Sequence, residues 1–108
     1  RERGVVVPQR EGPDAFFIYL GQEAKTAALR LIEQARTQGL SAECAFGDRS
    51  MKAQMKAADR AGARWAIIIG DAELAKGVAA AHSLASANQV EVPLDSIIPW
   101  LEEHAQVT

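Results

Sequence analysis

Apolar side chains near the start of the chain form two patterns, first continuous and then periodic. The run Ala15-Phe16-Phe17-Ile18-Tyr19-Leu20 is apolar or aromatic throughout and is followed by glycine, which predicts a strand buried on both faces. Over residues 22–38 apolar side chains recur every three or four positions, with charged side chains on the other side. Gly39 follows directly, as is typical just past a helix end. We therefore expect a strand and then a helix.

A second strand, helix and strand follow with similar punctuation. Residues 41–46 are short and mixed in character, and they predict a strand because one must follow a helix of this length. A helix is then expected to run to about Ala61, capped by Asp48 or Ser50 and ended by a glycine. Its inward-facing residues are expected to be Met51, Met55 and Ala58. Residues 64–70 are apolar almost throughout, which predicts a strand in the middle of a sheet.

The last third of the chain changes character. A short helical turn is expected over 70–74, followed by two modest strands over 77–82 and 89–92, joined by a polar turn. Pro93 ends this hairpin, and Pro99 is a point where a last helix can kink or restart, because proline has no amide donor. That helix carries apolar side chains at Leu94, Ile97, Ile98 and Leu101, with Trp100 as an anchor. Two strand–helix–strand units in a row predict three parallel strands, and the hairpin adds at one edge.

Length and composition fit one α/β domain. The chain has 108 residues, with 48% hydrophobic and 24% charged, which is enough for a core that needs no disulfide or metal. Residues 1–13 are punctuated by glycine and proline and are interpreted as a linker or lead-in, with the domain over 14–108. A native N-terminus that was trimmed is the alternative. No apolar run approaches the length of a membrane span, so a soluble cytoplasmic protein without membrane partners is the expectation.

Charge and cysteine content limit the possible chemistry. The net charge is −2, whereas a domain held to nucleic acid by phosphate attraction alone is usually strongly basic. Any RNA binding is therefore expected to be local and selective for shape. The single cysteine, Cys44, has no partner for a disulfide and no neighbours for a metal site, so we interpret it as a small apolar strand residue.

Three glycine-started loops are expected to meet beyond the carboxyl ends of the parallel strands, where open α/β sheets bind ligands. They are residues 21–23, 47–50 and 70–73, although glycine can simply end a strand. A nucleotide phosphate does not fit, because the chain has no G-x-G-x-x-G or Walker pattern and Glu23 would repel an anion at the helix start. No cofactor is expected.

Catalysis is not supported by the residues either. The only histidines are His82 and His104, and neither has the partners that a nucleophile or general base requires. Asp71 and Glu73 are interpreted as capping or ending a turn rather than as an acid–base pair. We expect no catalytic and no metal-binding residues.

One predicted helix carries a row of cations. Arg49, Lys52, Lys56 and Arg60 lie three or four positions apart, which aligns them on one face. A solvated helix face is the ordinary explanation. Against it, the only acidic residues in this stretch are Asp48 and Asp59, so the row is a positive surface on an acidic chain. Such a surface could hold an RNA backbone.

These segments closely resemble the C-terminal anticodon-binding domain of bacterial histidyl-tRNA synthetases, which has the class IIa anticodon-binding fold. The resemblance extends over residues 14–102 and is carried by Phe46-Gly47-Asp48-Arg49-Ser50-Met51-Lys52-Ala53-Gln54-Met55-Lys56, Ala58-Asp59-Arg60, Gly62-Ala63-Arg64-Trp65-Ala66-Ile67-Ile68-Ile69-Gly70-Asp71-Ala72-Glu73-Leu74 and Gly77-Val78. It implies a three-layer α/β/α domain with a mixed five-stranded sheet and three main helices. It also implies a domain that grips the anticodon stem-loop of tRNA and is not catalytic by itself. The parent implied is an ATP-dependent histidine–tRNA ligase and a homodimer, whose separate catalytic domain is a second partner.

The resemblance assigns candidate RNA contacts. Glu73 matches the family's acidic residue after the central strand and could accept hydrogen bonds from guanine. Arg49 could pair with phosphate or stack on a base, while Lys52 and Lys56 could hold the backbone. Stacking candidates are Tyr19 and Phe46, which are alternatively core residues, and Gln54 is a weaker candidate on the second helix.

The match departs from the family at one strand. Where the family usually reads Val-x-Val-Arg, this chain reads Ala79-Ala80-Ala81-His82, which places His82 where an arginine commonly faces the RNA. Imidazole cannot make the two-pronged contact of a guanidinium, so one anticodon interaction differs. Together with the negative charge, this departure supports an alternative function, a regulatory or protein-interaction paralogue that keeps the fold without recognising tRNA.

Overall fold

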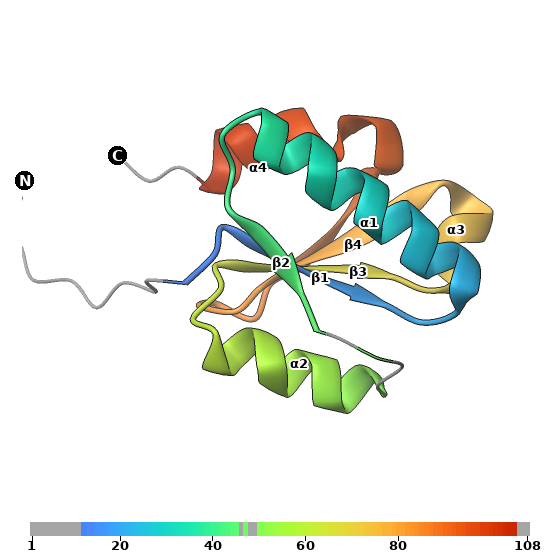
Figure 1. Ribbon diagram of the computed structural model, residues 1–108, viewed down its shortest axis with the longest axis horizontal. Helices are drawn as coiled ribbons and strands as arrows, with labels where there is room; N and C mark the ends of the chain where they lie inside the picture. Colours follow the sequence, from blue (N-terminus) through green and yellow to red (C-terminus); the bar gives the residue numbers. More distant parts are fainter. Residues whose placement is uncertain (1–11, 46, 48–49, 106–108) are drawn as a thin grey trace, which may run out of the picture.

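The computed structural model describes residues 12–45, 47 and 50–105, and it shows a five-stranded sheet between two layers of helices (Figure 1). The elements follow one another as β1 (Ala15–Tyr19), α1 (Gln22–Thr37), β2 (Ala42–Cys44), α2 (Met51–Arg60), β3 (Trp65–Ile69), α3 (Asp71–Lys76), β4 (Val78–Ser83), β5 (Gln89–Pro93), the 3-10 turn η1 (Leu94–Ser96) and α4 (Ile97–Ala105). The strand order is β2-β1-β3-β4-β5. The predicted three-layer α/β class is confirmed.

The sheet is mixed, as the chain order requires. β1 pairs in parallel with both β2 and β3, because a helix connects each pair and returns the chain in the same direction. β4 runs antiparallel to β3, and β5 runs antiparallel to β4, which confirms the hairpin at one edge. Its turn is closed by Ser83 N–H donating to Asn88 O at 2.7 Å, with Ala87 in the left-handed region at φ 65°. The strongest apolar run forms β3, in the middle of the sheet.

Two hydrophobic clusters lie on the two faces of the sheet. The larger lies under α1 and α4, and its largest fully buried members are Phe17, Ile67, Ile69, Ile97 and Leu101. The smaller lies under α2, and its buried members are Phe16, Ile18, Ala58, Ala63, Ala66, Ile68 and Ala80. Odd-numbered residues of β1 and β3 therefore face α1 and α4, and even-numbered residues face α2, as strand alternation requires.

Two details of the sequence prediction change, and one alternative is settled. The second strand covers only Ala42–Cys44, and Ser50, not Asp48, is the N-cap of α2, its Oγ accepting a hydrogen bond from Ala53 N–H at 3.1 Å. The prediction that Met51 faces inward is wrong: it is 36% exposed, and the buried residues of α2 are Gln54 and Ala58.

Pro99 does not interrupt the last helix. α4 begins at Ile97, so Pro99 occupies its first turn, where the amide N–H would have no helical partner and its loss costs little. In the part of the chain that the structure describes, no helix has the length and apolar character needed to cross a membrane.

Candidate functional site

The carboxyl ends of the parallel strands come together at one end of the sheet. We call the turns that begin at Gly21, Gly47 and Gly70 the rim. A Cβ atom added to Gly21 would lie 3.5 Å from Asp71 Oδ1, so the turns after β1 and β3 are neighbours. Gly21 and Gly47 have φ of 104° and 83°, a region that favours glycine. Gly70 is instead confined by space, because a Cβ there would lie 2.9 Å from Glu73 Oε1.

Tyr19 connects the segment around Gly47 to β1. Its hydroxyl lies 3.2 Å from Ala45 O and 3.5 Å from Gly47 O, and its ring is in the core, with the residue only 4% exposed. A buried ring has no free face for a base, so direct stacking by Tyr19 does not fit this geometry. Phe46 and Arg49, the other candidates from this turn, lie outside the described residues.

Gln54 is also buried, and both the oxygen and the nitrogen of its amide bond to the backbone of Tyr19. Gln54 Oε1 accepts a hydrogen bond from Tyr19 N–H at 3.0 Å, and Gln54 Nε2 donates to Tyr19 O at 2.7 Å. The residue is 1% exposed. Direct RNA contact by Gln54 does not fit this arrangement either, because both polar ends of the amide already have partners inside the protein. Its polarity serves the fold.

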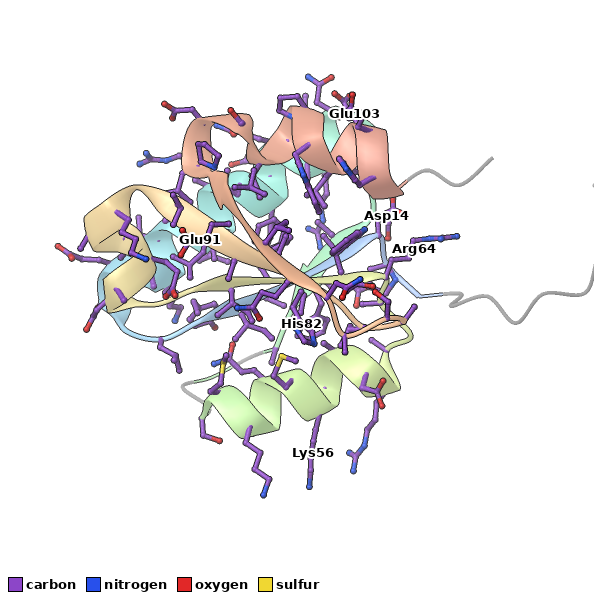
Figure 2. The ribbon with its side chains drawn as sticks, turned by 180° about the vertical axis from the view of Figure 1, so that it is seen from behind. Asp14, Lys56, Arg64, His82, Glu91 and Glu103 are labelled. Atoms are coloured by element: carbon purple, nitrogen blue, oxygen red, sulfur yellow. The ribbon has the colours of Figure 1, made fainter. Side chains whose placement is uncertain are left out.

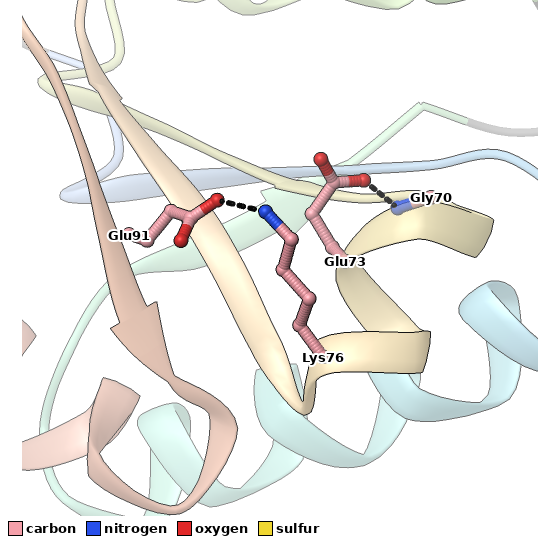
Figure 3. Close-up of polar contacts among 4 residues, drawn as sticks. All are labelled: Gly70, Glu73, Lys76 and Glu91. Atoms are coloured by element: carbon pink, nitrogen blue, oxygen red, sulfur yellow. Dashed lines mark hydrogen bonds and ion pairs between the residues drawn. The ribbon is translucent and has the colours of Figure 1, made fainter.

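Glu73 caps the helix on which it lies. Its Oε1 accepts a hydrogen bond from Gly70 N–H at 2.9 Å, which satisfies a donor at the start of α3 (Figure 3). The interpretation of Glu73 as a cap is confirmed. A carboxylate accepts several hydrogen bonds, so this one leaves acceptor capacity on the half-buried side chain. Nearby, Lys76 on α3 pairs with Glu91 on β5 at 3.0 Å, and both side chains are exposed.

The described cations of α2 share its outer face. Lys52, Lys56 and Arg60 are exposed and lie four positions apart, whereas Gln54 and Ala58 face the sheet. Lys56 points away from the sheet in Figure 2. Lys52 lies in the first turn of α2 and is therefore the one of these three cations closest in sequence to the rim. The row thus leads from the rim along the outside of α2.

The pairing of β4 with β3 places His82 away from the rim. His82 is opposite Ala66, three residues before β3 ends, which is roughly 10 Å along the strand. It shares a sheet face with Ala80 and therefore lies on the α2 side, where the half-buried ring is visible in Figure 2. His82 Nδ1 lies 3.2 Å from Gln89 Oε1 on β5. The structure therefore brings Glu73 and Lys52 to the rim but not His82.

The opposite end of the sheet is closed by aromatic side chains. Trp65 packs edge-on against Trp100 with centroids 4.7 Å apart, and Trp100 stacks on His104 at 4.1 Å. Trp65 Nε1 donates to His104 O at 3.4 Å. Trp100 thus anchors the last helix, as the sequence predicted, and this helix lies beside α1 rather than over the rim (Figure 1).

Groups suited to metal binding do not assemble in the described residues. Within residues 12–45, 47 and 50–105, no three His, Cys, Asp or Glu side chains are placed to hold a metal ion. Burial raises the pKa of the Cys44 thiol, which disfavours its reactive thiolate form, although Arg36 partly opposes the shift.

Comparisons with known proteins identify relatives over almost the whole chain. The anticodon binding domain family matches residues 5–104. The chain is 39% identical over 103 residues to the histidine–tRNA ligase of Pelotomaculum thermopropionicum, covering 95% of this chain and 24% of the relative. It is 44% identical over 85 residues to that of Corynebacterium diphtheriae, covering 79% and 20%. The apo histidyl-tRNA synthetase of S. aureus has a TM-score of 0.80 at 30% identity, covering 91% of this chain and 29% of that one. The chain therefore spans about a quarter of the length of the curated relatives it matches.

Proposed function

Because this chain belongs to the anticodon binding domain family and matches the C-terminal region of histidyl-tRNA synthetases, we propose that it binds the anticodon stem-loop of a histidine tRNA. The observation that carries the proposal is the family match over residues 5–104. The domain then serves a ligase whose ATP-dependent catalytic domain lies in the rest of a homodimeric parent. It contributes RNA binding and no chemistry.

The rim is the proposed place for the anticodon bases. Specific recognition of an RNA loop requires unstacked bases whose edges are read by hydrogen bonds. Gly21, Gly47 and Asp71 are exposed there, and glycine leaves the backbone open to a flat group. Glu73 accepts the N–H groups of a guanine edge through the acceptor positions that Gly70 does not occupy.

The first turn of α2 is the proposed contact for the RNA backbone. It carries Lys52 and no acidic side chain, whereas the first turns of α1 and α3 contain Glu23 and Asp71. The positive end of this helix dipole is therefore not opposed by a carboxylate of its own first turn, which favours a phosphate beside Lys52. Lys56 extends the contact along the outer face. Arg49 and Phe46, which precede α2 in the sequence, remain proposed contacts.

A titration of the chain with a labelled histidine-type anticodon stem-loop tests this function. We expect tighter binding of this hairpin than of one with a scrambled loop. Raising the salt concentration should weaken the binding of both hairpins, and the logarithm of the binding constant should fall with the logarithm of the salt concentration by about 0.7 to 0.9 per phosphate neutralised. The total slope should be small, because only a few cations face the RNA. Equal affinity for the two loops at low and high salt would exclude anticodon recognition.

A regulatory or protein-interaction role is the second candidate, and the β4 departure favours it. His82 replaces the arginine expected by family resemblance, lies away from the rim and has its Nδ1 near Gln89. If His82→Arg creates RNA binding that the original chain lacks, the RNA site has been lost in this protein. If His82→Arg changes selectivity by less than about twofold, His82 is not a determinant of binding.

A further inference from the structure

β1 extends farther toward the rim than its neighbour β2. The two strands pair only through Ala15–Ala42, Phe16–Glu43 and Phe17–Cys44. On its other side β1 remains paired with β3 as far as Tyr19–Ile69, and Leu20 N–H donates to Ile69 O. Because alternate residues of a strand direct their amides to opposite sides, Tyr19 directs its N–H and C=O toward the side where β2 has already ended.

Gln54 replaces the missing strand at this position. A buried backbone N–H and C=O require hydrogen-bond partners, and the side-chain amide of Gln54 supplies one acceptor and one donor, at 3.0 and 2.7 Å. The pairing also fixes which way the amide points. The helix α2 is therefore joined to β1 by a polar contact that depends on the shape of the glutamine side chain.

The same residue of β1 also holds the turn that leads into α2. The Tyr19 hydroxyl donates to Ala45 O at 3.2 Å and lies 3.5 Å from Gly47 O. Tyr19 thus fixes the turn through its side chain and the first half of α2 through its backbone. Lys52 lies two positions before Gln54 on the opposite side of this helix, so its location at the rim follows from where Gln54 is held.

We propose that Tyr19 and Gln54 are positioning residues for RNA binding, which hold Ala45, Gly47 and the first turn of α2 with Lys52 in register with the end of β1. This inference rests on the proposed function. Neither residue touches the RNA. They act by holding one side of the rim at a fixed distance from Glu73 on the other side, so that a base and its phosphate are bound together. Preorganised contacts of this kind bind more tightly because less ordering is needed on binding.

The test uses two substitutions of graded severity. Tyr19→Phe removes only the hydroxyl, and Gln54→Met removes both amide hydrogen bonds without changing the charge. We expect RNA affinity to fall about fivefold for Tyr19→Phe and about tenfold or more for Gln54→Met, from the usual net value of one or two hydrogen bonds. Gln34→Met, the same change at an exposed position of α1, should bind RNA as the original chain does.

A double-mutant cycle separates positioning from general stability. In the original chain, Lys52→Ala should lower the salt slope of RNA binding by about one phosphate. In a Tyr19→Phe or Gln54→Met background the same change should have a smaller effect, because Lys52 no longer meets its phosphate. Fully additive effects would overturn the proposal. Thermal unfolding identifies a variant that does not fold, and Tyr19→Phe keeps the test decisive if Gln54→Met is such a variant.

Amide hydrogen exchange measures the pair without RNA. Exchange at Ala53 and Gln54, whose amides donate to Ser50 at the start of α2, should become several-fold faster in Tyr19→Phe, and exchange at Ala35 in α1 should not change. If exchange is unchanged at every position, the proposed positioning role of Tyr19 and Gln54 is wrong, even when the original chain binds the anticodon loop. If the original chain shows no preference for the histidine-type loop, the proposed function is wrong, and so is the role of Tyr19 and Gln54 in it. The two failures are therefore distinguishable.

Discussion

The two faces of the sheet are covered by different kinds of side chain. On the face covered by α1 and α4, large side chains such as Phe17, Ile69 and Leu101 are fully buried. On the face covered by α2, the helix and β4 contribute mainly alanines, Ala58 and Ala80 among them, and the only fully buried long side chain of the described part of α2 is the polar Gln54. The first contact depends on apolar area, and the second combines apolar contacts with the hydrogen-bond geometry of Gln54.

The difference suggests that one face contributes mainly to folding stability and the other to RNA binding. Free energy from apolar burial scales with area, so most of the folding stability is expected from the α1–α4 face. α2 leaves part of its own face of the sheet uncovered, where His82 is half-buried and Gln89 and Glu91 are exposed. The residues proposed for RNA binding lie at the rim and on α2. A change on one face should therefore affect stability, and a change on the other should affect RNA binding.

The largest expected effect is on the α1–α4 face. Leu101→Ala should lower the free energy of unfolding by roughly 2–5 kcal/mol, because Leu101 is 0% exposed and its loss leaves a cavity. Equilibrium denaturation in urea measures it. Leu29→Ala, the same substitution at a residue that is 46% exposed on α1, should change stability by less than about 0.5 kcal/mol. Similar losses for the two variants would contradict the division between the faces.

A smaller effect, on selectivity instead of stability, is expected at Glu73. Glu73→Gln keeps an acceptor for Gly70 N–H but removes the negative charge, so the preference for the histidine-type loop should fall by roughly 1–3 kcal/mol. Competition between the two labelled hairpins measures the preference. Glu91→Gln makes the same charge change at an exposed ion pair and should leave the preference intact. Parallel losses in both variants would point to overall charge, not base recognition.

Lys52 should contribute affinity without selectivity. Lys52→Ala should weaken binding of both hairpins by about 1 kcal/mol and lower the salt slope by about one, because a lysine at a phosphate reads no sequence. Titrations at several salt concentrations give both quantities. Lys25→Ala, on α1 and therefore on the other face of the sheet, serves as the matched control and should change neither. A slope that stays constant in Lys52→Ala would remove Lys52 from the interface.

The sequence was sufficient for the elements but not for the polar part of the site. The run ending at Ile69 predicted the central strand because a strand buried on both faces must be apolar at every position. The burial of Gln54 was not predicted, because hydropathy assigns a glutamine to the outside of a helix. Hydropathy likewise assigned the apolar Met51 to the inside, although it is exposed. Only the early end of β2 creates a need for an amide at that point. The location of His82 away from the rim could not be predicted, because strand register is not encoded locally.

Cys44 provides the smallest effect and tests whether the edge of the α1–α4 face is packed. It lies half-buried at the end of the edge strand β2, and burial raises the pKa of its thiol. A thiol whose pKa is higher in the folded state stabilises that state below its unfolded pKa, and the stabilisation is lost as the pH rises through the folded value. The folded chain should therefore react with a disulfide reagent more slowly at pH 8 than the chain unfolded in urea, with the difference narrowing at higher pH. Equal rates at pH 8 would mean that the thiol is solvated and that β2 is not held against α1 at this point.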